Sequence, residues 1–182
     1  LTSASSKTAL SLAFLLSKYK LKDRKKIIAI TSEKNMQFVS EIKLYDTVLS
    51  YDNAEENIKR SKSVIVDFAG NSDYLKKLSD HLGEELKHVS LIGLADWSSK
   101  TNFKSIPNSK FFFAPNHAEK RYREMGVKRT TLLADELLKE FIMKIKNYIK
   151  LEYCNDPKEL HELYLKSLKG KIDPSKGYMV KN

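Results

Sequence analysis

The chain has 182 residues, the length of one domain, and its 41% hydrophobic and 31% charged content is typical of a globular protein. A net charge of +10 would suit nucleic-acid binding, but only five of the 33 basic side chains are arginines and the lysines are spread along the chain, which disfavours it. A single cysteine, Cys154, excludes an internal disulfide, and the four histidines lack ligand spacing. We therefore expect a cytoplasmic protein with no metal site and, because no apolar run is long enough, no membrane span.

Apolar, β-branched runs alternate with helical patterns through the first half of the chain. The chain opens at the end of a strand, which runs into a helix over residues 6–19. A polar turn at 21–24 separates this helix from the next strand. Further strands are predicted over 26–31, 46–51, 63–68 and 88–93, with helices over 33–43 and 74–82.

The pattern changes after the fifth strand. Residues 96–109 are polar and predict a loop, and Lys110–Pro115 is an aromatic strand closed by proline. Helices are predicted over 116–125, 130–151 and 157–168, and the turn-rich segment 169–177 is expected to be weakly structured.

Strands that alternate with helices at this spacing predict an α/β fold with a mainly parallel sheet. We expect a single Rossmann-like, doubly wound domain over residues 1–182 with extra C-terminal helices. A sheet of this kind binds its ligand across the carboxyl ends of its strands, so the turns after the strands are the candidate sites.

The first turn carries Ser3, Ser5, Ser6, Lys7 and Thr8 ahead of a buried helix. A helix N-terminus offers free N–H groups and a positive dipole, and the hydroxyls and the ammonium add donors, which predicts a phosphate site. The alternative is that a serine only caps the helix and that the lysine is solvated. A P-loop is disfavoured, because no glycine precedes the lysine.

The second and third strands end in residues that bear on the choice of dinucleotide. Ser32 and Lys34 form a small polar and basic end, as in sites that accept a 2′-phosphate, whereas the adjacent Glu33 resembles the carboxylate of sites that bind NAD. We therefore predict NADP(H) rather than NAD(H). Tyr51 could stack on or hydrogen-bond to the adenosine half, or it could be an ordinary edge aromatic.

Small residues follow the fourth and fifth strands. Phe68, Ala69 and Gly70, together with Gly93 and Ala95, would bring backbone close to a nicotinamide ribose. Tight packing of strand on helix is the alternative explanation. No set of residues predicts a general acid or base, so the catalytic residues stay unknown.

Taken together, these motifs resemble the cofactor-binding domain of the zinc-free, quinone-oxidoreductase-like medium-chain dehydrogenases/reductases. The turn SASSKTA stands where that family has a glycine-rich turn, YDTVLSY is similar to its strand-three segment, and DFAG to its strand-four segment. The narrower resemblance is to an uncharacterised branch known only as a domain of unknown function. It shares TSASSKTA and FFAP followed by Lys-Arg, which here are residues 2–9, 112–115 and 120–121.

The resemblance implies a zinc-independent oxidoreductase that uses NADP(H) on an unknown small-molecule substrate. Ser32, Lys34 and Tyr51 would surround the 2′-phosphate. A GroES-like catalytic domain would precede residue 1, and Phe111–Phe113 would be the edge through which a homodimer forms. Because the first turn has no glycine, a degenerate scaffold that binds no dinucleotide is the second hypothesis.

Overall fold

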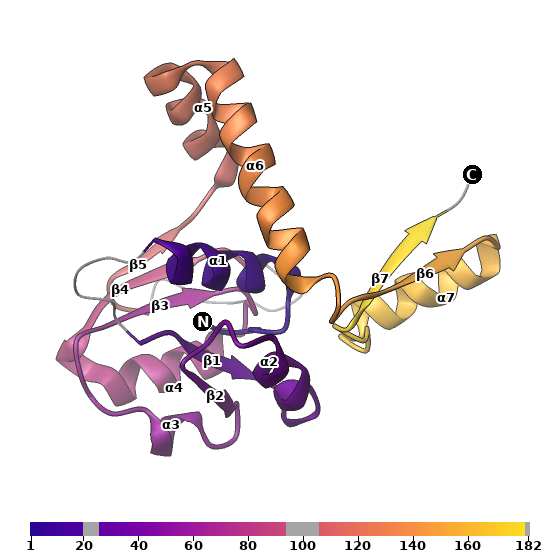
Figure 1. The fold of residues 1–182 in the computed structure, drawn as a ribbon. Coiled ribbons are helices and arrows are strands. Elements are labelled where there is room, and N and C mark those ends of the chain that lie inside the picture. Colours follow the sequence, from indigo (N-terminus) through magenta and orange to yellow (C-terminus); the bar gives the residue numbers. More distant parts are fainter. Residues whose placement is uncertain (20–25, 94–105, 181–182) are drawn as a thin grey trace.

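The computed structural model describes residues 1–19, 26–93 and 106–180 of an α/β chain (Figure 1). Within these ranges every paired strand is parallel to its neighbour. One-turn 3₁₀ helices at Glu33–Asn35 and Gly83–Glu85 precede α2 and β4, respectively. The helices and strands, in chain order, are α1 (Lys7–Lys18), β1 (Ile28–Thr31), α2 (Met36–Ile42), β2 (Thr47–Ser50), α3 (Ala54–Asn57), β3 (Ser63–Asp67), α4 (Ser72–Leu82), β4 (Leu86–Leu91), β5 (Ser109–Phe111), α5 (Ala114–Met125), α6 (Val127–Ile145), β6 (Lys150–Cys154), α7 (Pro157–Leu168) and β7 (Lys176–Val180).

The strands form three small sheets, in the orders β1–β2, β3–β4–β5 and β6–β7. The first two residues of the chain lie between the first two of these sheets. The nitrogen of Leu1 donates to the carbonyl of Ile28 at 2.7 Å, and Ile30 N–H donates back to the carbonyl of Leu1 at 2.9 Å. On the other side, Thr2 N–H donates to the carbonyl of Val66, in β3, at 3.1 Å. Leu1 and Thr2 therefore join β1 to β3 through backbone hydrogen bonds.

Helices cover both faces of these strands, because successive residues of a strand point to opposite sides. Ala29 of β1 packs with Val39 of α2, whereas its neighbour Ile30 packs on the other side, with Leu75 of α4. A third cluster joins α1, α2 and the end of α6. Its buried members are Leu10, Ala13, Ile27, Ile42, Leu44, Phe141 and Ile145.

The C-terminal third extends away from this body (Figure 1). The helices α5 and α6 pack against each other, and the end of α6 packs on α1, where the ring centroids of Phe141 and Phe14 lie 5.7 Å apart. Phe111 and Phe113 flank the end of β5, the last strand of its sheet, and are 54% and 50% exposed. No helix among the described residues is long and apolar enough to cross a membrane.

The structure differs from the sequence prediction mainly after residue 145. The helix predicted over 130–151 ends at Ile145, and β6 begins at Lys150 because this segment pairs with β7, a strand that the turn-rich composition of 169–177 concealed. The aromatic strand predicted to end at Pro115 is shorter, since Ala114 and Pro115 begin α5. The short helix α3 was not predicted. The predicted turn at 21–24 and most of the loop predicted over 96–109 lie outside the described residues.

Candidate functional site

The turn between the first strand and α1 lies at the carboxyl ends of the joined strands. Ser3 has a φ of 46°, the left-handed region in which glycine is the usual residue. Ser6 is the N-cap of α1, and its Oγ accepts a hydrogen bond from Ala9 N–H at 3.2 Å. A serine therefore caps α1, as the alternative to a phosphate site predicted, and a turn precedes this helix.

Three side chains from other elements hold this turn from its strand side. The hydroxyl of Tyr51, after β2, accepts from Ser3 N–H at 2.8 Å. The hydroxyl of Tyr45 donates to the carbonyl of Ala4 at 2.8 Å, and Asn35 Nδ2 donates to the Oγ of Ser5 at 3.2 Å. Tyr51 thus contacts the turn itself. These three contacts hold the turn without any contribution from a ligand.

The helix side of the same turn keeps free donors. Among the described residues no acceptor contacts the backbone N–H of Ser5, Lys7 or Thr8. Lys7 and Thr8 are exposed, and they are the first two residues of a 12-residue helix. The unpaired N–H groups of Lys7 and Thr8 therefore lie at the positive end of the helix dipole on an exposed turn, whereas Ser5 is buried.

The ammonium of Lys7 is engaged elsewhere. Its Nζ donates to the carbonyl of Pro174 at 2.8 Å and to that of Lys176 at 2.7 Å. Burial lowers the pKa of Lys7 from its ordinary value, and the nearby carboxylate of Asp173 opposes this shift. The ammonium of Lys7, which was predicted to bind a phosphate, therefore binds the C-terminal segment in this structure.

The end of β1 contains an unpartnered hydroxyl. The Oγ of Ser32 is buried and has no hydrogen-bond partner among the described residues. Lys34 follows on the surface. Across from β1, the rings of Tyr51 and Tyr74 meet edge to face at 4.8 Å, and the hydroxyl of Tyr74 is a second buried atom without a described partner. Burial raises the pKa of both tyrosines. Unpaired buried hydroxyls are costly, so they mark places where a further donor or acceptor fits.

The end of β3 is tied to the first strand by buried polar groups. Thr2 Oγ1 donates to the carboxylate of Asp67 at 2.5 Å and accepts from Phe68 N–H at 3.0 Å and from Ala69 N–H at 3.3 Å. Asp67 also accepts from Gly70 N–H at 2.9 Å, and Gly70 has a φ of 73°. The N–H groups of Phe68, Ala69 and Gly70 are thus used inside the protein, and the sequence did not predict that Thr2 and Asp67 hold them.

Gly93, after β4, packs directly on the end of β3. A Cβ at this position would lie 2.3 Å from the carbonyl oxygen of Phe68, so only glycine fits. This geometry agrees with the packing explanation of Gly93. Ala95, the remaining predicted site residue, lies outside the described residues.

A mostly apolar pocket of about 470 Å³ lies beside this edge. It contains two of the predicted site residues, Thr8 and Phe68, and thereby connects the first turn with the end of β3. Its other lining residues come from α1, from the end of β4 and from the segment around β5: Ser11, Leu12, Leu15, Ile92, Phe111, Phe112, Phe113, Ala114 and Pro115. Periodicity marked the α1 residues as helical but could not pair them with the aromatic strand.

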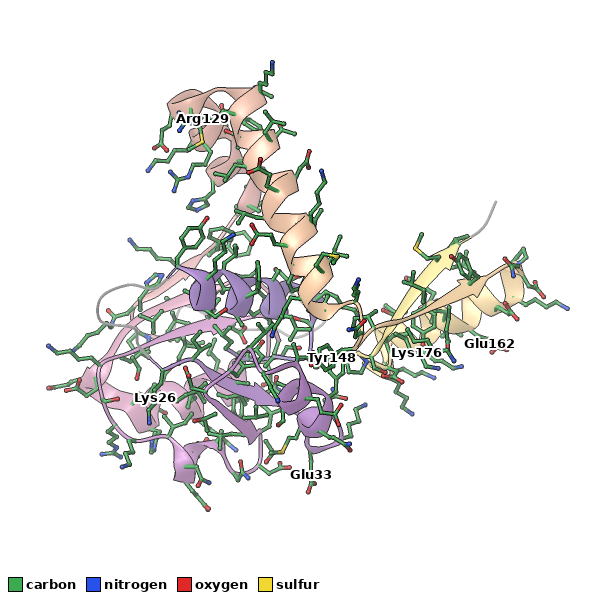
Figure 2. All side chains as sticks on the ribbon, viewed as in Figure 1. Lys26, Glu33, Arg129, Tyr148, Glu162 and Lys176 are labelled. Atoms are coloured by element: carbon green, nitrogen blue, oxygen red, sulfur yellow. The ribbon has the colours of Figure 1, made fainter. Side chains whose placement is uncertain are left out.

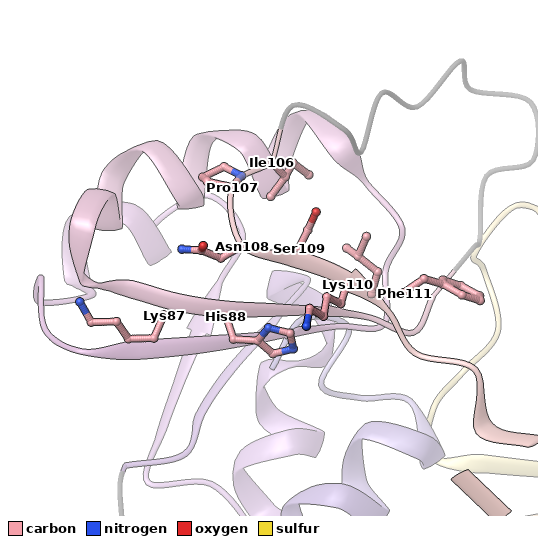
Figure 3. Close-up of a pocket in the computed structure, with 9 residues that line it drawn as sticks. Lys87, His88, Ile106, Pro107, Asn108, Ser109, Lys110 and Phe111 are labelled. Atoms are coloured by element: carbon pink, nitrogen blue, oxygen red, sulfur yellow. The ribbon is translucent and has the colours of Figure 1, made fainter. Parts of the chain in front are cut away.

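A second pocket, of about 720 Å³, follows the β4–β5 edge (Figure 3). Lys87, His88, Asn108 and Lys110 line it, and it contains none of the predicted site residues. Over the described ranges, no group of three or more His, Cys, Asp or Glu residues could hold a metal ion. The predicted residues that come together are therefore those of the first turn with Tyr51, and Thr8 with Phe68.

The chain matches a family model described as "Protein of unknown function (DUF2855)" over residues 1–173, and it belongs to that family. No curated protein matches the chain.

Proposed function

We propose that this DUF2855 protein is a Rossmann-like domain that binds NADP(H), as part of a zinc-independent oxidoreductase-like protein whose substrate is unknown. Hydride chemistry would come from the cofactor, and the protein would bind and orient it. The observation that carries the proposal is the position of the first turn, with its free N–H groups, at the carboxyl ends of joined parallel strands.

The order of the strands supports a dinucleotide rather than another anion. With the segment Leu1–Thr2 included, the order is β2, β1, residues 1–2, β3, β4, β5. The order reverses at residues 1–2, because the chain moves outward to β1 and β2 and then returns to β3. Dinucleotides bind at such a reversal, with the pyrophosphate on the N-terminus of the helix that follows the first strand.

The turn fits a diphosphate on one of its two sides. The N–H groups of Ser5, Lys7 and Thr8 are unpaired in the described part of the chain. The hydroxyl of Thr8 lies on the exposed first turn of α1. Ser3 already adopts the left-handed conformation that a glycine would supply, which supports a phosphate turn without the glycine. A phosphate would approach from the helix side.

The 2′-phosphate would lie at the end of β1. The buried Oγ of Ser32 has no partner in the part of the chain that the structure describes and could donate to a phosphate oxygen, and the exposed Lys34 would add a positive charge. The nicotinamide half would extend toward Phe68 and the apolar pocket, which Thr8 also lines. This arrangement uses residues that the sequence predicted, and two of them, Thr8 and Phe68, line the pocket.

A degenerate scaffold is the competing function, and specific contacts favour it. Tyr51 takes up Ser3 N–H, and Lys7 is bound to two carbonyls. Thr2 accepts from the N–H groups of Phe68 and Ala69. Such a domain would bind other protein surfaces and no dinucleotide.

Calorimetric titration with NADPH, NADH and ADP separates these functions. We expect NADPH to bind more tightly than NADH. Lys34→Ala should reduce this preference about tenfold, which corresponds to the loss of one charge-assisted contact. The matched control is Lys62→Ala, since Lys62 is exposed and directly precedes β3, at the amino end of that strand and not at a carboxyl end. If none of the three ligands binds, the scaffold is the correct function.

A further inference from the structure

The segment β6–α7–β7, residues 150–180, forms a C-terminal unit beside the body (Figure 1). The extensive contacts of its two strands and its helix, as far as the structure describes them, are with one another. Tyr148 and Ile149, just before the unit, pack at the margin of the α1–α2–α6 cluster. Figure 2 labels the side chains of Tyr148 and Lys176, which lie where the C-terminal unit meets the body. The unit is therefore held to the body over a small area.

One contact in this area comes from the proposed phosphate site. Lys7, the first residue of α1, donates from its ammonium to the carbonyls of Pro174 and Lys176. Two hydrogen bonds hold the turn that presents these carbonyls: Asp173 Oδ1 accepts from Ser175 N–H at 2.9 Å and from the Ser175 hydroxyl at 2.6 Å. A 2.8 Å ion pair between Lys176 and Glu152 of β6 continues the turn into the unit.

We propose that phosphate binding at α1 and docking of the C-terminal unit compete for Lys7, so that the bound dinucleotide releases the unit. This inference rests on the proposed function and adds its regulation. The ammonium of Lys7 would donate either to the two carbonyls of the unit or to the diphosphate.

The competition follows from the chemistry of the two partners. Lys7 now donates to neutral carbonyl oxygens, and two of its three ammonium protons are used. A diphosphate carries full negative charges and forms stronger, charge-assisted hydrogen bonds with the same group. The carbonyls that lose Lys7 belong to only half-buried residues, where water can replace it. Release of the unit therefore costs little free energy and is reversible. Because coupling between two binding events is reciprocal, any free energy that the Lys7 contacts contribute to docking of the unit is lost from the binding free energy of the ligand.

Hydrogen exchange of the whole protein reports directly whether Lys7 holds the C-terminal unit. The reporter amide is Lys176 N–H, which donates to the carbonyl of Asp173 at 3.2 Å. We expect saturating NADPH to accelerate exchange in peptides that cover 171–178. Lys7→Met should exchange quickly there without ligand and should not respond further to NADPH. The matched control is Lys18→Met at the other end of α1, where the lysine pairs with Glu140 of α6 and not with the unit.

A second variant weakens the turn that Lys7 binds but keeps Lys7 itself. Ser175→Ala removes the hydroxyl that orders the turn, and we expect it to bind NADPH about threefold more tightly, because one weak hydrogen bond no longer supports the competing state. Weaker binding by Ser175→Ala would overturn the inference. So would calorimetrically saturated NADPH that slows exchange over 171–178 or leaves it unchanged, since the turn would then be part of the site or independent of it. If no phosphate ligand binds at all, the proposed function fails, and the inference fails with it.

Discussion

Replacing Thr2 by valine tests whether the first residues form the strand that joins β1 to β3. The side chain of Thr2 is fully buried and Asp67 is 1% exposed, so water cannot replace a lost partner. Valine keeps the shape but removes Oγ1, which donates to Asp67 and accepts from Phe68 N–H and Ala69 N–H. A hydrogen bond to a charged group contributes about 2 kcal/mol, and an amide left unpaired in the interior adds about 1 kcal/mol. We expect a loss of about 3 kcal/mol in the free energy of unfolding.

Equilibrium unfolding in urea measures this loss. With a slope of about 2 kcal/mol per molar urea, Thr2→Val should lower the midpoint by about 1.5 M at unchanged slope. Thr2→Ser is the matched control: it keeps the hydroxyl and loses one methyl group, which costs about 0.8 kcal/mol. Equal midpoints for the valine and serine variants would refute the buried network that links Thr2 to the end of β3.

Three further substitutions, the last with a matched control, test other parts of the structure. Gly93→Ala places a Cβ 2.3 Å from the backbone oxygen of Phe68, so we expect a loss of about 3 kcal/mol in urea unfolding, and an unchanged midpoint would contradict this close approach. Ser3→Gly should raise stability by about 1 kcal/mol, because glycine adopts the φ of 46° without strain; a lower melting temperature would argue against the left-handed turn. Phe141→Ala should cost about 3 kcal/mol, because Phe141 fixes α6 to α1, whereas the exposed neighbour Ile142, changed to alanine, should cost less than about 1 kcal/mol; similar losses for both would mean that α6 packs by another face.

The sequence predicted the elements that have a strong local pattern. The strands at β1 to β4 and the helices α1 and α4 appear where β-branched runs and amphipathic stretches indicated them. The carboxyl edge was also predictable, since parallel strands place their following turns together. The end of α6 was not, because Tyr148 to Cys154 fits either a helix or a strand and only pairing with the distant β7 decides between them.

The contacts of the candidate site were beyond local reasoning for the same physical reason. Ser3 and Tyr51 are 48 residues apart, and Lys7 and Pro174 are 167 residues apart. Residue type predicted that Lys7 would seek an anion or water, but only the fold brings two carbonyls to it. The unpartnered Oγ of Ser32 likewise shows only in three dimensions, although the position itself was predicted from the end of the second strand.

The central claim is that the free N–H groups at the start of α1 hold the diphosphate of NADP(H). A titration with NADPH followed by ¹⁵N–¹H correlation spectra measures this residue by residue. We expect saturable shifts of the Ser5, Lys7 and Thr8 amide signals, with Ser32 responding to NADPH more than to NADH. Saturable shifts confined to the β4–β5 edge, or no shift at any of these amides, would contradict it.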